Sequence, residues 1–143
     1  MTFLLDVNVL IALLDPAHAS FTVARDWFKS TGKTSWATCP ITENGVIRIV
    51  GRPSYPNTPG PPAIVAEILR NLCALPGHEF WPDSISLLDG RYFEAAKIGT
   101  PRDMTDIYLL ALAATHEGRL ATFDRRLSTN GVVGGRRALC VIG

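Results

Sequence analysis

The sequence predicts an α/β fold, a three-layer α/β/α sandwich with a central, mainly parallel sheet. Short β-type runs alternate with helical patterns along the chain, and strands separated by helices pair in parallel and are covered on both faces. The segment Ile107–Ala114 is hydrophobic at every position, which indicates a helix buried on all sides. The chain has 143 residues, 47% of them hydrophobic, so residues 1–143 fit a single domain with a sizeable core.

The strands are expected from short apolar runs, and the helices from apolar residues that recur at helical spacing. We expect strands at Thr2–Leu5, Thr34–Ala37, Phe80–Trp81, Arg119–Phe123 and Ala138–Ile142. We expect helices at Val9–Leu14, Ala19–Lys29, Pro40–Val50, Ala63–Cys73, Arg91–Ile98 and Met104–Glu117. Five of the ten prolines lie within Gly51–Pro62, which predicts a stiff surface loop.

Composition argues against several classes of protein. No run of about 20 apolar residues is present, as a transmembrane helix would need, and no basic stretch precedes the apolar segment Val7–Leu14. We therefore expect a cytoplasmic protein without membrane contact. Three widely spaced cysteines without a CxxC pair are typical of reduced thiols. The three histidines are scattered as well, so any metal site is expected to use oxygen ligands.

Two aspartates directly follow predicted strands. Asp6 comes after Phe3–Leu5, and Asp124 comes after Leu120–Phe123. Ligands of open parallel sheets bind outside the carboxyl ends of the strands, so neighbouring strands would bring both side chains to one crevice. Either aspartate could instead cap a helix that follows it.

Glu43 is expected on the buried face of its helix. Residues three, four and seven positions later share that face, and these are Val46, Ile47 and Val50. An unpaired carboxylate on such a face would be destabilising. A metal ion or a buried arginine is therefore the expected partner.

Asp106 lies at the start of the most hydrophobic helix, on a face with Leu109, Leu110 and Ala113. Alternatively, Asp106 only stabilises this helix, because a negative charge in the first turn interacts favourably with the helix dipole. Asp103 fits the role of helix cap better.

If these four carboxylates converged without a cation, they would repel one another. Mg²⁺ or Mn²⁺ fits an oxygen-only ligand set, and such a centre activates water and stabilises a leaving oxygen. The chemistry predicted is metal-dependent hydrolysis of a phosphodiester. The predicted catalytic and metal-binding residues are Asp6, Glu43, Asp106 and Asp124.

The rest of the chain is mildly basic. With the four acids set aside, 14 basic residues face nine acidic ones, and 11 of the basic residues are arginine, which suits forked contacts to phosphate. A nucleic-acid substrate fits this balance. The candidate phosphate contacts are Arg48, Arg52, Arg125 and Arg126, although an ordinary solvated surface explains each of them equally well.

Three segments resemble the PIN-domain ribonucleases, specifically the VapC-type toxins of bacterial toxin–antitoxin pairs. They are LLDVNVLIALLD at Leu4–Asp15, TCPITENGVIRI at Thr38–Ile49 and RDMTDIYLLALAATHEGRLATFDRRL at Arg102–Leu127. They stand in the family's order and spacing, and the resemblance spans essentially the whole chain. It implies a PIN-like fold, Mg²⁺- or Mn²⁺-dependent endoribonuclease activity that inhibits translation and growth, and a site built from the same four acids.

The resemblance also implies supporting residues and partners. Asn8 would orient the first acid or a metal-bound water, and Thr122 would support the fourth acid. Asp103 would support the third acid, although a plain helix cap is the simpler role. The implied partners are an RNA substrate, with transfer RNA as one candidate, a VapB-type antitoxin and a second copy of the chain in a homodimer.

Two other functions stay open on the residues alone. Asp6 and Asn8 after the first strand suggest a phosphatase with an aspartyl nucleophile. That scaffold needs a second aspartate where Asn8 stands and a lysine, and Lys97 is the only lysine beyond position 33. The other alternative is an RNA- or protein-binding module whose acids only cap helices, and whose RNA binding would not respond to a chelator.

Overall fold

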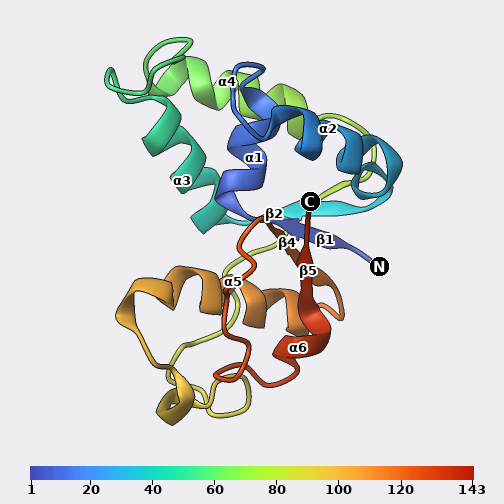
Figure 1. The fold of residues 1–143 in the computed structure, drawn as a ribbon, viewed down its shortest axis with the longest axis vertical. Coiled ribbons are helices and arrows are strands. Elements are labelled where there is room, and N and C mark those ends of the chain that lie inside the picture. The colour runs from blue at the N-terminus through green and yellow to red at the C-terminus, as the bar shows by residue number, and fades with distance from the viewer.

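The five strands form one sheet in which every neighbouring pair is parallel (Figure 1). The strand order is β3-β2-β1-β4-β5, so β1 is central. The computed structural model describes residues 1–143. Its strands are β1 (Phe3–Leu5), β2 (Trp36–Thr38), β3 (His78–Phe80), β4 (Arg119–Thr122) and β5 (Leu139–Val141). Its α-helices are α1 (Val7–Leu14), α2 (Phe21–Ser30), α3 (Pro40–Val50), α4 (Pro62–Cys73), α5 (Met104–Thr115) and α6 (Gly135–Ala138).

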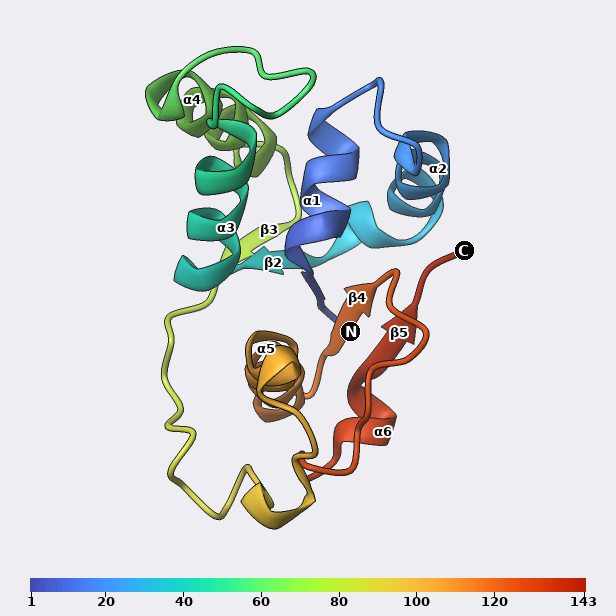
Figure 2. The ribbon, with the colours of Figure 1, turned by 60° about the vertical axis from the view of Figure 1, so that its left-hand side comes forward.

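Helices cover both faces of the sheet, which confirms the predicted three-layer sandwich. The helices α1 to α4 lie on one side of the sheet, and α5 and α6 lie on the other (Figure 1, Figure 2). Successive strand residues point to opposite faces. Leu4 and Leu120 accordingly belong to the core cluster around α5, whereas Leu5 and Ala121 belong to the cluster that contains α1.

The helix α5 is buried on all sides, as its sequence predicts. Every residue from Ile107 to Ala113 is buried, and the helix packs against β1, β4 and α6. A helix can be apolar around its whole circumference only where protein surrounds it. None of the helices, α5 included, has the length and apolar character needed to cross a membrane.

The carboxyl edge of the sheet is where the chain turns directly from strands into helices. A single residue, Asp6, joins β1 to α1, and a single residue, Cys39, joins β2 to α3. Because β2, β1 and β4 are neighbours, residues that follow them meet at one edge. The fold therefore places Asp6 and Asp124 at the same end of the sheet.

The proline-rich segment Gly51–Pro62 forms a loop between α3 and α4, as expected. The Tyr55 hydroxyl donates a hydrogen bond to Asp15 Oδ2 at the end of α1. The Thr58 hydroxyl donates to the Val50 carbonyl at the end of α3, over 2.6 Å. These bonds fasten the loop to the ends of two helices.

The predicted helix at Arg91–Ile98 is wrong. Phe93 is buried and forms an antiparallel bridge with Val132. The Glu94 N–H donates to the Gly131 carbonyl, and the Tyr92 carbonyl accepts from Val133. These long-range bonds use backbone groups that a helix would need for itself, so only a 3₁₀ turn remains, at Ala95–Lys97.

Two other boundaries differ from the prediction. The strand β3 ends at Phe80, and Trp81 instead joins the core while its N–H donates to the Thr38 carbonyl. Before β5 the chain forms the short helix α6, which the sequence did not suggest. It begins after Gly134, whose φ of 74° is accessible to glycine at little cost.

Close packing of α1 against α3 depends on Gly45. A Cβ at this position would lie 2.7 Å from Val7 Cγ2. We predict that Gly45→Ala lowers the free energy of unfolding by about 1 kcal/mol, because overpacking outweighs the better helix propensity of alanine. Chemical denaturation of the purified protein measures this change. Gly90→Ala is the matched control, since a Cβ there meets nothing within 4 Å. A Gly45→Ala protein as stable as wild type would contradict this packing.

Candidate active site

Asp6 is held at the carboxyl edge of the sheet by two donors. Its Oδ1 accepts a hydrogen bond from the Val7 N–H over 2.7 Å, and its Oδ2 accepts one from the Thr122 hydroxyl over 2.8 Å. Thr122 ends β4, the strand beside β1. Asp6 itself is only 5% exposed. Asp6 therefore does cap α1, and the same bonds fix both of its oxygens in place.

Asp124 is joined to Asp6 through the same threonine. Its N–H donates to the Thr122 hydroxyl oxygen over 3.1 Å, and its Oδ1 accepts from the Arg126 N–H over 2.8 Å. The alternative that Asp124 caps a helix is wrong, because a turn follows it. Thr122 thus lies beside both aspartates, which agrees with the supporting position expected for it.

Asp106 reaches the same region from the first turn of α5. It lines a cavity of about 510 Å³ together with Asp6 and Asn8. Asp103, just before α5, is close enough to add to the negative potential at Asp106. Asp103 occupies the N-cap position of α5, but its side chain makes no capping hydrogen bond. The simpler role proposed for Asp103 is therefore not observed.

Burial and mutual repulsion raise the pKa values of two of these acids. Burial raises the pKa of Asp6, and the charge of Asp124 adds to this, while the bonds from Thr122 and the Val7 N–H oppose it. Burial together with repulsion from Asp6, Asp124 and Asp103 raises the pKa of Asp106 to about 6. Asp6, Asp103, Asp106 and Asp124 thus form one interacting group of carboxylates.

Glu43, the other acid of the predicted site, makes its hydrogen bond outside this group. Its Oε2 accepts a hydrogen bond from the Thr38 hydroxyl over 2.9 Å, and that hydroxyl lies 2.8 Å from His78 Nε2. Glu43 is half-buried, and its face of α3 is apolar, as the sequence indicated. The hydrogen-bond partner of Glu43 within the protein is thus the Thr38 hydroxyl, and no arginine pairs with it.

The rotation of α3 explains why Glu43 turns away. Successive helix residues are separated by about 100°, so residues two positions apart point in nearly opposite directions. Gly45 faces Val7 on α1 and lines the cavity. Glu43 therefore points toward β3 and α4, where its charge affects His78 and Cys73.

Three cavity residues were missed by the sequence analysis. Asn44 lines the cavity from α3. It lies one turn before Arg48 and shares its helix face, so the phosphate contact expected at Arg48 was a signal for Asn44 as well. Thr105 stands next to Asp106. Asp83 follows β3 without a recognisable motif, and its Oδ1 accepts a hydrogen bond from the buried Tyr108 hydroxyl.

Of the four arginines expected to contact phosphate, one lines the cavity. This is Arg48, on α3. Arg125 donates instead to the carbonyl oxygen of Gly143. Arg52 and Arg126 are exposed and do not line the cavity. The structure thus brings Arg48 to the acids and leaves the other three outside the cavity.

The donors in the cavity suit a hard divalent cation. Carboxylate and amide oxygens are the ligands that Mg²⁺ and Mn²⁺ prefer, and Asp6, Asp106 and Asn8 supply them. Burial, together with the charges of neighbouring aspartates, raises the pKa values of Asp6 and Asp106, and a bound cation would favour their ionised forms. No three acidic, histidine or cysteine side chains are already arranged to hold one ion. Mg²⁺ usually keeps several waters, so few protein ligands are needed.

Comparison with known proteins assigns this fold and acidic cavity to a class. The PIN domain family matches residues 3–132, so the chain belongs to the PIN-domain proteins. A crystal structure of VapBC2 from Rickettsia felis, bound to a DNA fragment from its promoter, has a similar fold. Its TM-score is 0.57 at 12% sequence identity, and the match covers 99% of this chain and 98% of that one.

Within that class the chain belongs to the VapC ribonuclease family. It is 40% identical over 134 residues to ribonuclease VapC44 of Mycobacterium tuberculosis strain H37Rv, covering 94% of each chain. It is 42% identical over 134 residues to ribonuclease VapC39 of the same strain, covering 94% of this chain and 96% of the relative. The family expected from the three sequence segments is thereby confirmed.

The raised pKa of Asp106, caused by burial and by repulsion from its neighbours, makes a prediction about stability. The pKa of Asp106 in the folded protein, about 6, lies above its ordinary value of 3.8. The folded state therefore binds a proton more tightly than the unfolded chain, and the stability contributed by that proton is lost as pH rises through 6. We predict that Asp106→Asn raises the free energy of unfolding at pH 7 by about 1 kcal/mol in EDTA, after allowance for partial solvent exposure.

Denaturant unfolding of the metal-free protein at pH 7 and pH 4 tests this, and the gain is expected only at pH 7. Asp26→Asn is the control, because Asp26 is exposed and pairs with Arg25 on α2. A loss of stability at pH 7 on Asp106→Asn would show that the ionised Asp106 carboxylate is not destabilised by its burial and its neighbours.

Proposed function

We propose that this protein is the toxin of a type II toxin–antitoxin pair, a metal-dependent endoribonuclease that hydrolyses RNA phosphodiester bonds and so inhibits translation and growth. Its relatives in the family are named as ribonucleases. The observation that carries the proposal is the group of mutually repelling aspartates around a cavity at the carboxyl edge of the sheet. A cation bound beside such a group would relieve the repulsion among its carboxylates near neutral pH.

We propose Mg²⁺ or Mn²⁺ as that cation. Asp6 and Asp106 would hold it, Asp124 would complete the site directly or through a bound water, and Asn8 would orient Asp6 or a bound water. When bound, the ion would polarise the scissile phosphate and lower the pKa of an attacking water. Glu43 is left out of the ligand set because its carboxylate is engaged by Thr38 on the other face of α3.

The protein's own groups position the substrate. Arg48 lines the same cavity and would contact a phosphate oxygen with its forked guanidinium. The Asn44 amide, one turn earlier on α3, would hydrogen-bond the ribose or the phosphate. Thr122 and the Val7 N–H hold Asp6 in one orientation before the substrate arrives, so no reorganisation of this carboxylate is needed.

The acidic cavity is also suited to binding an inhibitory protein. A VapB-type antitoxin that presents a cationic side chain would neutralise the same carboxylates and exclude substrate. The VapBC2 structure of Rickettsia felis is one protein of this fold solved with its antitoxin. A homodimer and a transfer RNA substrate are further parts of the proposal, and both come from the family resemblance alone.

The phosphatase alternative receives no support from the cavity. An aspartyl nucleophile of that type works beside a second aspartate and a lysine. Asn8 occupies the place of the second aspartate, and no lysine lines the cavity.

We predict that Asp6→Asn and Asp106→Asn each slow RNA cleavage by about 100-fold or more, because each removes a charge that holds the cation. Glu43→Gln is predicted to slow cleavage less than about tenfold, since an amide oxygen can still accept the Thr38 bond. The measurement is cleavage of total cellular RNA by the purified chain free of antitoxin, with Mg²⁺, with Mn²⁺ and with EDTA.

Cleavage that persists in EDTA, or in Asp6→Asn, would refute a metal-dependent nuclease at this site. A loss on Glu43→Gln as large as that on Asp6→Asn would instead return Glu43 to the ligand set. Circular dichroism of each variant separates these results from unfolding.

A further inference from the structure

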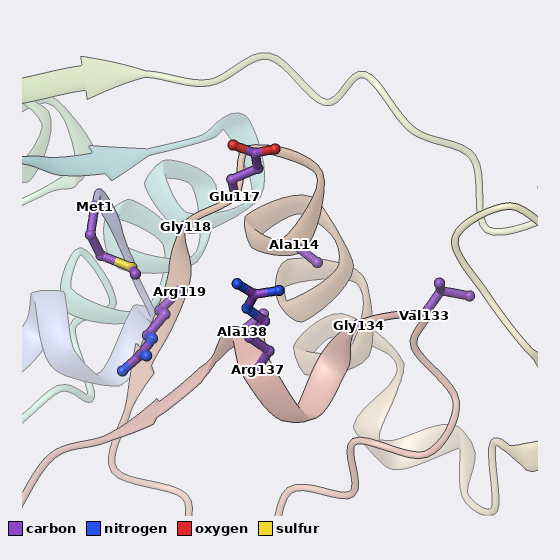
Figure 3. Close-up of a pocket in the computed structure, with 9 residues that line it drawn as sticks. All are labelled: Met1, Ala114, Glu117, Gly118, Arg119, Val133, Gly134, Arg137 and Ala138. Atoms are coloured by element: carbon purple, nitrogen blue, oxygen red, sulfur yellow. The ribbon is translucent and has the colours of Figure 1, made fainter.

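A second cavity lies at the opposite edge of the sheet from the aspartates. It has a volume of about 510 Å³ and is bounded by the turn between α5 and β4 and by α6 (Figure 3). Gly118, just before β4, and Met1, before β1, line it. Both precede strands of a parallel sheet, so this cavity is at the amino-terminal edge, whereas the aspartates follow strands at the carboxyl edge.

The second cavity is basic. Arg119 and Arg137 line it with one acid, Glu117. Figure 3 shows Arg137 extending from α6 beside the turn that carries Glu117, and Arg119 leaving the start of β4 on the side of Met1. An adjoining cavity of about 450 Å³ shares Arg137 and adds Arg136. The carboxylate cavity, by contrast, has three acids and one arginine.

These arginines have no partner within the protein. Arg119, Arg136 and Arg137 take part in none of the ion pairs of the chain. The Nε of Arg119 is buried and has no hydrogen-bond acceptor. A buried donor without an acceptor is rare in folded proteins and calls for an explanation. An anion bound beside Arg119 would supply the missing acceptor once the guanidinium adjusts to it.

We propose that this cavity binds a phosphate group, from a free nucleotide or from the backbone of an RNA strand. Arginine matches phosphate with paired N–H donors, and the volume is typical of small-molecule sites. The cavity also has apolar lining residues, Met1, Ala114 and Val133, which lie at different points around it and offer contacts to a nucleoside (Figure 3). The proposal uses none of the aspartates, so it stands or falls independently of the proposed catalysis.

Metal-free conditions isolate the second cavity, because the carboxylate cavity then repels phosphate. Calorimetric titration in EDTA at low salt uses two probes, AMP and a short single-stranded oligoribonucleotide with a 5′-phosphate. Arg137→Gln and Arg119→Gln are each expected to weaken binding about tenfold. Glu117→Gln is expected to tighten it about threefold, since it removes the one negative charge. Arg70→Gln, which removes an exposed cation from α4, is the matched control and should have no effect.

Opposite effects at Arg137 and Glu117 would support a phosphate site, and they cannot arise from general loss of structure. Arg137 is exposed, so its variant should fold normally even if Arg119→Gln does not. Equal binding of AMP and the oligoribonucleotide would identify a free nucleotide as the ligand. Tighter, more salt-dependent binding of the oligoribonucleotide would identify RNA. Absence of saturable binding, or equal weakening by Arg70→Gln, would overturn the proposal.

Discussion

The Thr122 hydroxyl is the contact on which the arrangement of the acidic cavity depends. It donates to Asp6 Oδ2 and accepts from the Asp124 N–H, so one side chain fixes residues from two neighbouring strands. A hydroxyl can serve both bonds because it is donor and acceptor at once. The parallel pairing of β1 with β4 puts these groups within reach, and the buried α5 then adds Asp106 from the opposite face of the sheet.

A cavity of this kind lowers the stability of the protein that contains it. Asp6 and Asp106 would each be more readily ionised in the unfolded chain, as their raised pKa values show. The two hydrophobic clusters on either side of the sheet offset that loss. The strands and helices that position the cavity are therefore stabilised by the two hydrophobic clusters and not by the cavity itself. This is why the repelling carboxylates stay in place without a cation.

The sequence predicted the fold class and the family, because these depend on hydrophobic spacing and on motifs along the chain. Of the four acids expected to converge, Asp6, Asp106 and Asp124 interact with one another in the structure. Glu43 shows a limit of this reasoning. Its apolar face indicated burial correctly, but periodicity does not reveal that Gly45 is the residue of α3 that packs against Val7 on α1. The helix expected at Arg91–Ile98 failed for a similar reason, since the bridge from Phe93 to Val132 is a long-range pairing. Asp83 carries no local signal, and only the folded chain places it in the cavity.

The burial of α5 has a mechanical consequence. Asp106 lies in the first turn of this helix at the acidic cavity, and Glu117 lies just past its last turn at the basic cavity. The helix has 12 residues and therefore spans about 18 Å between the two cavities. Surrounded by protein along its length, it cannot bend locally without opening the core. A displacement along its axis at one end would be transmitted to the other. The two cavities are therefore connected by the helix that has the most buried residues in the fold.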